Sequence, residues 1–309
     1  MAIVVIRQDD KLELWKNALL QADAGVKVYD YLKEHPKEDI TMAVIWKHPV
    51  GALSPYPNLK CIASAGAGVD YIFEDPTRPK GIPITRIVDP YLASDMSEHV
   101  VSVILAHLKN LNAYKAQQIK KVWKPMEYQR IKEVTVGILG LGELGAQTAT
   151  DLISFGFQVQ GWSRSKKNIP HVTSFSGKEE LATFLESCNV LVCLLPLTPE
   201  TEGILNKDFL SQLPKNAYLV NVARGGHLVD GDLIMLLDNG HLSGACLDVF
   251  HKEPLPKAHP FWSHEKIHMT PHYASVSDPK SVIPQLLENY RRLGKGQELQ
   301  HQVDAEKGY

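Results

Sequence analysis

The feature that most constrains the fold of this chain is a glycine-rich turn near its middle. Gly140, Gly142 and Gly145 form a G-x-G-x-x-G pattern between an apolar run at 134–139 and a helix-like pattern at 144–155. In such a turn the first glycine allows a tight bend, the second lets a pyrophosphate approach the backbone, and the third lets the helix pack closely on the strand. The N–H groups that open the helix then bind phosphate. We therefore predict dinucleotide contacts at Gly140, Leu141, Gly142, Glu143 and Leu144.

Short apolar runs alternate with helix-like stretches along most of the chain. In the first hundred residues the runs lie at Ala2–Ile6, Val26–Tyr29, Met42–Trp46, Cys61–Ser64 and Ile82–Ile87, with a helical stretch at Leu12–Leu20. A second series lies at Val134–Leu139, Phe157–Trp162, Val190–Leu195, Tyr218–Val222, Gly244–Val249 and Ile267–Thr270, with helical patterns at Leu144–Phe155 and Asp230–Asp238. Such alternation is typical of parallel sheets that are covered by helices. The sequence therefore predicts an α/β fold.

The length of the chain, 309 residues, favours two domains. Between the two series, Glu98–Leu111 is apolar on nearly every face and has no glycine or proline. We expect a buried helix there, between the two domains or at a subunit contact, with possible caps at Ser94, Asp95 and Ser97. A helical pattern at Pro284–Leu293 in the tail is expected to pack on the first domain.

Composition narrows the class of function. The net charge of −2 gives no basic footprint for nucleic acid or a membrane surface, and no apolar run reaches the roughly 18 residues of a membrane span. The apolar run at the N-terminus is too short for a signal sequence and is expected to be a strand. The cysteines lack the spacing of a metal site, and we expect buried thiols in a reducing cytoplasm. A redox pair of Cys188 and Cys193 is the alternative; the others are Cys61 and Cys246.

The turn after the second strand of the glycine-rich unit predicts which cofactor binds. An NAD site usually has an acid there that bonds to the ribose, whereas Trp162–Lys167 contains none. Arg164 and its neighbours instead offer a planar cation and hydroxyls to a 2′-phosphate. One charge-assisted hydrogen bond corresponds to roughly a ten- to hundredfold preference for NADPH over NADH. We predict NADP(H) contacts at Ser163, Arg164, Ser165 and Lys166, with a solvated basic turn as the alternative.

Three polar residues follow apolar runs in the second half of the chain. Arg224, Glu253 and His272 together supply a cation for a carboxylate, an acid and a proton donor. A carboxylate bonded to the imidazole holds its tautomer and favours its protonated form, and a guanidinium suits a carboxylate. This set is what the reduction of a 2-oxo acid requires. The alternative is that Arg224 and Glu253 form an ordinary ion pair.

The chain resembles the D-isomer-specific 2-hydroxyacid dehydrogenase family, and within it the glyoxylate/hydroxypyruvate reductase A branch. The motifs of the family lie at Leu195–Thr201, Asn221–Gly226, Asp232–Leu233 and His259–Trp262. The motifs of the branch lie at Trp46–Pro49, Gly66–Asp70, Trp162–Arg164 and Gly308–Tyr309. The stretch Asp89–Met96 matches the branch poorly, so the resemblance does not support substrate or nicotinamide contacts there.

The resemblance implies roles for individual residues. His272 would be the acid/base, Glu253 its partner and Arg224 the anchor of the substrate carboxylate. Ala67 and Gly68 would offer N–H groups to that carboxylate, Trp46 would line the pocket, and Asp248 would lie beside the nicotinamide amide. The remaining cofactor contacts would be Leu195, Pro196, Thr201, Val222 and Ala223. Simpler alternatives are a core role for Trp46, turn glycines at Gly66 and Gly68, a capping role for Asp248, and a strand break at Leu195-Pro196.

The resemblance also implies a homodimer of chains with two Rossmann-like/flavodoxin-like parallel-sheet domains and an active-site cleft between them. The substrate-binding domain would be discontinuous, 1–99 and 283–309, and the NADP-binding domain would be 100–282. The predicted function is NADPH-dependent reduction of glyoxylate to glycolate or of hydroxypyruvate to D-glycerate. Two alternatives are another D-2-hydroxyacid dehydrogenase, with a different 2-oxo acid or a preference for NAD, and a non-catalytic NADP(H)-sensing protein.

Overall fold

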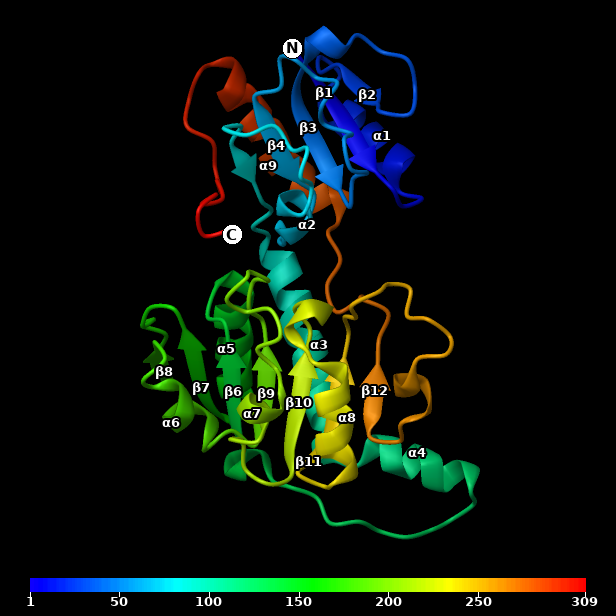
Figure 1. The fold of residues 1–309 in the computed structure, drawn as a ribbon, viewed down its shortest axis with the longest axis vertical. Coiled ribbons are helices and arrows are strands. Elements are labelled where there is room, and N and C mark those ends of the chain that lie inside the picture. The colour runs from blue at the N-terminus through cyan, green and yellow to red at the C-terminus, as the bar shows by residue number, and fades with distance from the viewer. The chain divides into compact units, whose positions relative to one another are not determined.

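The computed structural model describes residues 1–309 and divides the chain into two compact units, each built on one parallel sheet (Figure 1). Unit 1 comprises Met1–Tyr91 and Ser277–Tyr309, and unit 2 comprises Leu92–Val276. The predicted boundaries at 99 and 283 fall inside two helices, α3 (Pro90–Leu108) and α9 (Pro279–Gly294). None of the helices combines the length and the apolar character that crossing a membrane requires.

Unit 1 contains five parallel strands in the order β2-β1-β3-β4-β5, which is the flavodoxin-like order. The strands are β1 (Ala2–Arg7), β2 (Val28–Asp30), β3 (Ile40–Trp46), β4 (Cys61–Ser64) and β5 (Ile84–Thr85). Successive residues of β1 alternate between two cores. Ile3 and Val5 pack with α1 (Leu12–Ala22) and α9, whereas Val4 and Ile6 pack with Ile72 of α2 (Asp70–Phe73). Both faces of the sheet are therefore covered.

Unit 2 contains seven parallel strands in the order β12-β11-β10-β9-β6-β7-β8. The strands are β6 (Thr135–Leu139), β7 (Gln158–Ser163), β8 (Val172–Ser176), β9 (Val190–Cys193), β10 (Ala217–Asn221), β11 (Leu242–Leu247) and β12 (Ile267–Met269). The strand order reverses between β6 and β9, as in a Rossmann fold. Ligands of open α/β sheets bind at the carboxyl ends of strands beside such a reversal.

Helices cover both faces of the sheet of unit 2 (Figure 1). On one face α3 packs beside α5 (Glu143–Phe155), and on the other lie α6 (Leu181–Leu185), α7 (Lys207–Leu210) and α8 (Asp230–Asp238). The helix α4 (Leu111–Ile119) has no buried residue. Short 3-10 helices lie at Lys37–Asp39, Ile131–Glu133, Gly225–His227 and Pro260–Ser263. Two parallel-sheet α/β units confirm the predicted fold class.

The structure corrects several predicted elements. The sequence did not predict the strand β8, because three of the five residues in Val-Thr-Ser-Phe-Ser are polar and none is buried. The helix α3 begins at Pro90 rather than at Glu98, so the three predicted caps lie inside it. Its start is supported by Asp89, whose carboxylate accepts a hydrogen bond from the Tyr91 N–H at 3.1 Å. Proline at the first helical position after an aspartate is a recognised start signal.

Candidate active site

The glycine-rich turn lies between β6 and α5, as predicted. Gly140 has a φ of 99°, and a side chain at Gly145 would come within 1.9 Å of the Gly140 carbonyl oxygen. A side chain at Gly142 would meet no atom within 4 Å, so this face of the turn is open to a ligand. The first N–H groups of α5, including those of Glu143 and Leu144, have no partner within the helix. The turn therefore fits a pyrophosphate.

Leu141 contributes to this turn differently from its neighbours. Its side chain is buried, and a side chain at Gly161 would come within 2.5 Å of it. Leu141 thus packs the turn onto β7. Any contact that it makes with a cofactor has to come from its backbone.

The basic turn after β7 lies close to acidic side chains that its own sequence does not contain. Ser163 is buried and donates a hydrogen bond to the Ser165 carbonyl oxygen at 2.8 Å, whereas Arg164, Ser165 and Lys166 are exposed. Lys166 forms an ion pair with Glu180 at 2.8 Å. The pKa of Glu200 is held below its usual range, mainly by a hydrogen bond from Thr198 and also by the charge of Arg164. The fold thus brings two acids near the turn that are distant in sequence.

The loop after β9 is held by side chains from two segments. The Thr201 hydroxyl donates to the Pro196 carbonyl oxygen at 2.7 Å and accepts from the Thr198 N–H at 2.9 Å. His227 is fully buried, with its ring nitrogens 3.1 Å from the Arg224 carbonyl oxygen and 3.3 Å from that of Pro196. Thr201 and His227 therefore fix the loop that begins at Leu195. Nothing in the sequence singled out His227.

The loop after β10 positions Arg224. Asn221 is fully buried, donates to the Arg224 carbonyl oxygen at 3.0 Å and accepts from the Ala223 N–H at 3.2 Å. Val222 and Ala223 are buried as well. The Arg224 side chain is half-buried and donates from Nη1 to the Ala223 carbonyl oxygen at 2.7 Å. Asn221 thus sets the backbone from which the guanidinium extends.

Glu253 and His272 meet although they lie on different loops. His272 Nδ1 is 2.7 Å from Glu253 Oε2, and Glu253 Oε1 accepts a hydrogen bond from the Phe250 N–H at 3.2 Å. Glu253 follows β11 and His272 follows β12, both beyond the carboxyl ends of their strands. The His272 backbone is left-handed, with a φ of 54°. The His–Glu pair that the sequence predicted is therefore present.

Asp248 braces the loop that carries His272. It is 1% exposed and accepts hydrogen bonds from the Thr270 hydroxyl at 2.5 Å, the Tyr273 N–H at 2.9 Å and the Ala274 N–H at 3.0 Å. The Asp248 carbonyl oxygen also accepts the His272 N–H at 2.8 Å. The carboxylate therefore holds the loop after β12 and not the turn that follows Asp248 in the sequence, which was the expected capping alternative. The predicted contact with a nicotinamide amide stays a prediction.

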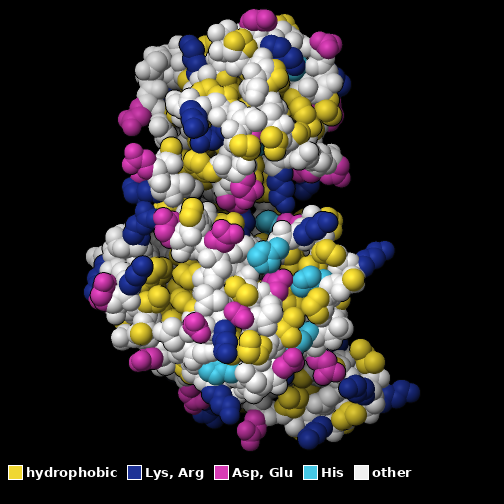
Figure 2. Space-filling view, in the orientation of Figure 1, with side chains coloured by type: hydrophobic (Ala, Val, Ile, Leu, Met, Phe, Trp, Pro, Cys, Tyr) yellow, Lys and Arg dark blue, Asp and Glu magenta, His cyan; other side chains and the backbone are white.

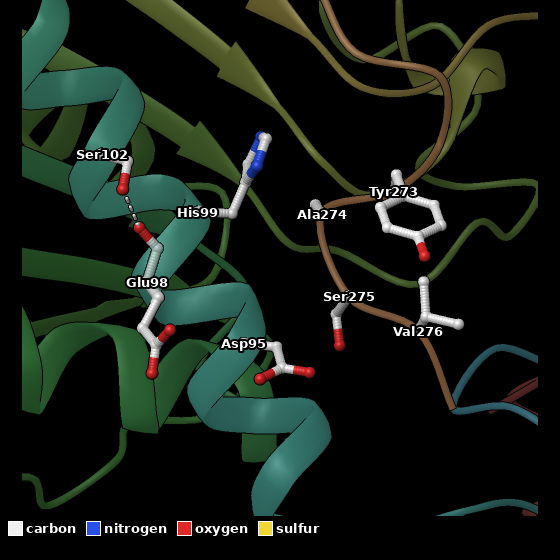
Figure 3. Close-up of a pocket in the computed structure, with 8 residues that line it drawn as sticks. All are labelled: Asp95, Glu98, His99, Ser102, Tyr273, Ala274, Ser275 and Val276. Carbon is white, nitrogen blue, oxygen red and sulfur yellow. Dashed lines mark hydrogen bonds between the residues drawn. The ribbon is translucent and has the colours of Figure 1, made fainter. Parts of the chain in front are cut away.

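A cavity of about 440 Å³ lies beside the segment that follows His272 (Figure 3). Asp95, Glu98, His99 and Ser102 line it from α3, opposite the segment Tyr273–Val276. Ser102 donates to the Glu98 carbonyl oxygen at 2.7 Å. None of the predicted catalytic or cofactor residues lines this cavity, so the candidate site is defined by the strand ends.

The predicted substrate residues of unit 1 lie at the carboxyl ends of β3 and β4. Trp46 ends β3 and is half-buried against the core. A side chain at Gly66 would come within 2.4 Å of the Trp46 indole, so the glycine is required by close packing. Ala67 and Gly68 are partly exposed beside them.

The cysteines are free and buried, as the sequence predicted, and burial raises the pKa of each thiol to about 12. Cys188 donates a hydrogen bond to the Phe184 carbonyl oxygen and is not bonded to Cys193. These thiols are packing residues. No group of three or more His, Cys, Asp or Glu side chains is arranged to hold a metal ion.

Comparisons with known proteins agree with this arrangement. Residues 101–274 match the model of the D-isomer specific 2-hydroxyacid dehydrogenase, NAD binding domain. The glyoxylate/hydroxypyruvate reductase A of Photorhabdus laumondii subsp. laumondii is 42% identical over 300 residues, which are 96% of each chain. A D-isomer specific 2-hydroxyacid dehydrogenase from Xanthobacter autotrophicus Py2, solved with NADPH and MES, has a TM-score of 0.95 at 38% identity, covering 100% of this chain and 99% of that one.

An NADPH-dependent glyoxylate/hydroxypyruvate reductase from Sinorhizobium meliloti was solved with NADP and sulfate. It has a TM-score of 0.93 at 36% identity and covers 100% of this chain and 99% of its own. The likeness thus extends over both units and is not confined to the dinucleotide-type sheet. The chain belongs to the D-isomer-specific 2-hydroxyacid dehydrogenase family.

Proposed function

We propose that this protein uses NADPH to reduce small 2-oxo acids, glyoxylate to glycolate and hydroxypyruvate to D-glycerate. The observation that carries the proposal is the 2.7 Å hydrogen bond between His272 and Glu253 in the loops after β11 and β12. Relatives that are named glyoxylate/hydroxypyruvate reductase match almost the whole chain, and two solved relatives hold NADPH or NADP.

His272 is the proton donor in this proposal. A carboxylate can only accept hydrogen bonds, so Nδ1 carries the proton shared with Glu253 Oε2. Nε2 then remains to deliver a proton to the carbonyl oxygen of the substrate as it becomes a hydroxyl. Glu253 stabilises the positive charge that the imidazole carries before the transfer. The Phe250 N–H, which bonds to the other oxygen of Glu253, holds the carboxylate in place.

Arg224 binds the substrate carboxylate in this proposal. A guanidinium forms two parallel hydrogen bonds with a carboxylate and also favours negative charge on a nearby carbonyl oxygen. Asn221 holds the backbone on both sides of the arginine, so the guanidinium starts from a fixed position. Ala67 and Gly68 add backbone donors to the carboxylate, and Trp46 packs against the substrate.

The residues present fit a bound NADPH. The open face at Gly142 and the start of α5 would hold the pyrophosphate, and Ser163 to Lys166 would face the 2′-phosphate. Leu195, Pro196, Thr201, Val222, Ala223 and Asp248 complete the proposed cofactor contacts. When bound, NADPH would supply the hydride that reduces the carbonyl carbon.

Steady-state kinetics with glyoxylate and hydroxypyruvate test the chemistry. We expect His272→Asn to lower kcat by about 10²–10⁴-fold, because the proton donor is lost. Glu253→Gln keeps the shape of the side chain but removes its charge, and should lower kcat about tenfold or more. The matched control is His264→Asn, which removes a histidine that also pairs with a carboxylate, Asp238, at 3.4 Å. Near-normal turnover by the His272 variant would refute the proposal.

The cofactor preference has its own test. Arg164→Ala should raise the KM for NADPH about tenfold and leave that for NADH unchanged, since only NADPH carries the 2′-phosphate. Lys215→Ala, which removes an exposed cation elsewhere in unit 2, serves as the control. A wild-type enzyme that prefers NADH would contradict the proposed role of Arg164. Binding of NADPH without turnover of any 2-oxo acid would favour a sensor.

We further propose that the protein is a homodimer whose contact includes the segment 111–130. None of its residues is buried, and hydrophobic side chains are visible on its surface at the lower right of Figure 2. It is folded back on itself by the Tyr114 hydroxyl, which accepts from the Met126 N–H at 2.9 Å, and by Asn110, which donates to the Glu127 carbonyl oxygen at 2.6 Å. Its exposed large apolar residues are Leu111, Tyr114, Ile119, Val122, Trp123, Met126 and Tyr128.

A second copy of the chain suits this segment because, in a two-fold dimer, the segment 111–130 of each chain covers the other chain. The contact is then made twice, which doubles the apolar area that one segment buries. Trp123 is 98% exposed and Ile119 is 77% exposed, which is unusual for an ordered apolar pair. Light scattering after gel filtration should give a dimer for the wild type and a monomer for the double variant Ile119→Asp/Trp123→Asp. Trp262→Asp, at another exposed tryptophan, should remain dimeric. A wild-type monomer would refute the proposal.

A further inference from the structure

The loop 65–69 of unit 1 is held by two hydroxyl groups. Ser64 is fully buried, and its Oγ lies 3.2 Å from the Gly66 nitrogen and 3.0 Å from the carbonyl oxygens of both Gly66 and Gly68. The Tyr71 hydroxyl lies 3.0 Å from the same Oγ and 2.9 Å from the Ile45 carbonyl oxygen. The two side chains thus connect the end of β3, the end of β4 and the loop.

The hydrogen bonds that the Ser64 hydroxyl can form depend on those that the Tyr71 hydroxyl forms, because few protons are available to the cluster. Each hydroxyl donates one hydrogen bond only. Ser64 Oγ accepts from the Gly66 N–H and donates to a loop carbonyl oxygen, which leaves one lone pair for the Tyr71 hydroxyl. Removing the Ser64 hydroxyl therefore takes bonds from the Gly66 N–H and the Gly68 carbonyl oxygen, and removing the Tyr71 hydroxyl takes from Ser64 Oγ the bond that orients it.

The ring of Tyr71 is itself fixed by its neighbours. Trp46 packs against it edge-on, with ring centroids 5.5 Å apart, and His48 does so at 5.9 Å. His48 is buried and bonded to Asp75 at 3.0 Å. The Tyr71 hydroxyl consequently has little freedom to leave Ser64.

The loop presents backbone donors that the chain does not use. No hydrogen bond within the chain engages the N–H groups of Ala67 and Gly68, although the carbonyl oxygens of Gly66 and Gly68 are bonded. Both residues are partly exposed. Successive unpaired N–H groups form a concave site for an anion. The contacts of Ser64 keep the carbonyl oxygens turned back, so that donors rather than acceptors face outward.

We propose that Ser64 and Tyr71 are a positioning pair that holds the Ala67 and Gly68 N–H groups in place for the carboxylate of the substrate. This inference rests on the proposed function and adds two residues that do not touch the substrate. Because the loop binds the carboxylate in the ground state and in the transition state alike, losing its geometry raises KM more than it lowers kcat.

The test uses Ser64→Ala, Tyr71→Phe and the double variant, each with NADPH bound. Oxalate, a carboxylate without a reducible ketone, is titrated by calorimetry, and KM and kcat are measured for glyoxylate. We expect each single variant to bind oxalate about five- to tenfold more weakly, the effect of one lost hydrogen bond. The double variant should bind oxalate only slightly more weakly than the single variant with the lower oxalate affinity, because the two hydroxyls act together. NADPH affinity should change less than twofold.

Tyr29→Phe, which removes a tyrosine hydroxyl from β2, is the matched control and should leave oxalate binding unchanged. The inference is wrong if both single variants bind oxalate as the wild type does, or if oxalate and NADPH affinities fall together, which indicates general damage. It is also wrong if the wild-type holoenzyme does not bind oxalate. Oxalate binding without turnover of any 2-oxo acid would instead refute the proposed function and leave the positioning pair supported.

Discussion

The loops at the strand ends of the two units are held by different chemistry. In unit 2 the loop of His272 is braced by the buried carboxylate of Asp248, and Gly225 lies against the backbone of Phe250. In unit 1 the loop 65–69 is braced by neutral hydroxyls, and Gly66 lies against the ring of Trp46. A charge-assisted hydrogen bond is stronger than a neutral one. A backbone contact also adjusts less readily to an added atom than a contact with a side chain does. We therefore expect the loops of unit 2 to tolerate less change.

Loss of the buried carboxylate should have the largest effect. Asp248→Ala leaves the Thr270 hydroxyl and the N–H groups of Tyr273 and Ala274 without their acceptor, so we expect the free energy of unfolding to fall by about 3–6 kcal/mol. Urea unfolding of the purified variant measures it. The control is Asp238→Ala, whose side chain is 69% exposed and which should cost less than about 0.5 kcal/mol. Similar losses in both variants would contradict the bracing role.

Adding a methyl group to each loop compares the two kinds of contact directly. A side chain at Gly225 would come within 2.0 Å of the Phe250 backbone, whereas one at Gly66 would meet only the far edge of the Trp46 ring, at 2.4 Å. We expect Gly225→Ala to cost about 3 kcal/mol of unfolding free energy and Gly66→Ala about 1–2 kcal/mol, because a ring can turn and a backbone cannot. Equal costs in urea unfolding would remove the distinction.

The response to acid sharpens the comparison through one histidine in each unit, the half-buried His107 and the buried His48. His107 stacks on Tyr218 at 3.8 Å, and burial lowers its pKa to about 4. Burial also lowers the pKa of His48, but the bond to Asp75 opposes that shift. The fold favours the neutral imidazole. The contribution of that neutral form to folding stability is therefore complete above pH 6.5 and is lost as the pH falls from 6.5 towards 4.

For His107 this loss amounts to about 3 kcal/mol at most. We expect urea midpoints to fall between pH 7 and pH 4.5, and His107→Gln to flatten that fall because it removes the titrating group. His48→Gln should change the slope less, since Asp75 already offsets part of the burial. If the slope of the His107 variant equals that of the wild type, another group governs the acid response.

The strongest sequence patterns led to correct elements. The continuous apolar runs became parallel strands because both faces of each sheet are buried, as in β9, where Val190 and Leu191 enter different cores. The edge strand β8 lacks such a run and was missed. The predicted start of α3 is wrong because Asp89 and Pro90 form the cap, whereas the later polar residues lie inside the helix.

The supporting residues of the site were not predictable in the same way. Glu180 and Glu200 reach the basic turn from other loops, and His227 links Arg224 to Pro196 across a long stretch of sequence. Glu180 and His227 lie in no motif, and the family motif that contains Glu200 does not indicate that its side chain lies near Arg164. What selects them is which loops the sheet order places side by side.

The amino-acid sequence by itself determined the two parallel-sheet units, the phosphate-binding turn and the pairing of His272 with Glu253, because periodicity, glycine spacing and strand ends are local properties. Only the tertiary structure decided which polar groups hold those residues in place, such as Asp248, Asn221, Ser64 and Tyr71. The reason is that a buried hydrogen bond depends on the distance between groups in space. Segments far apart along the chain set that distance.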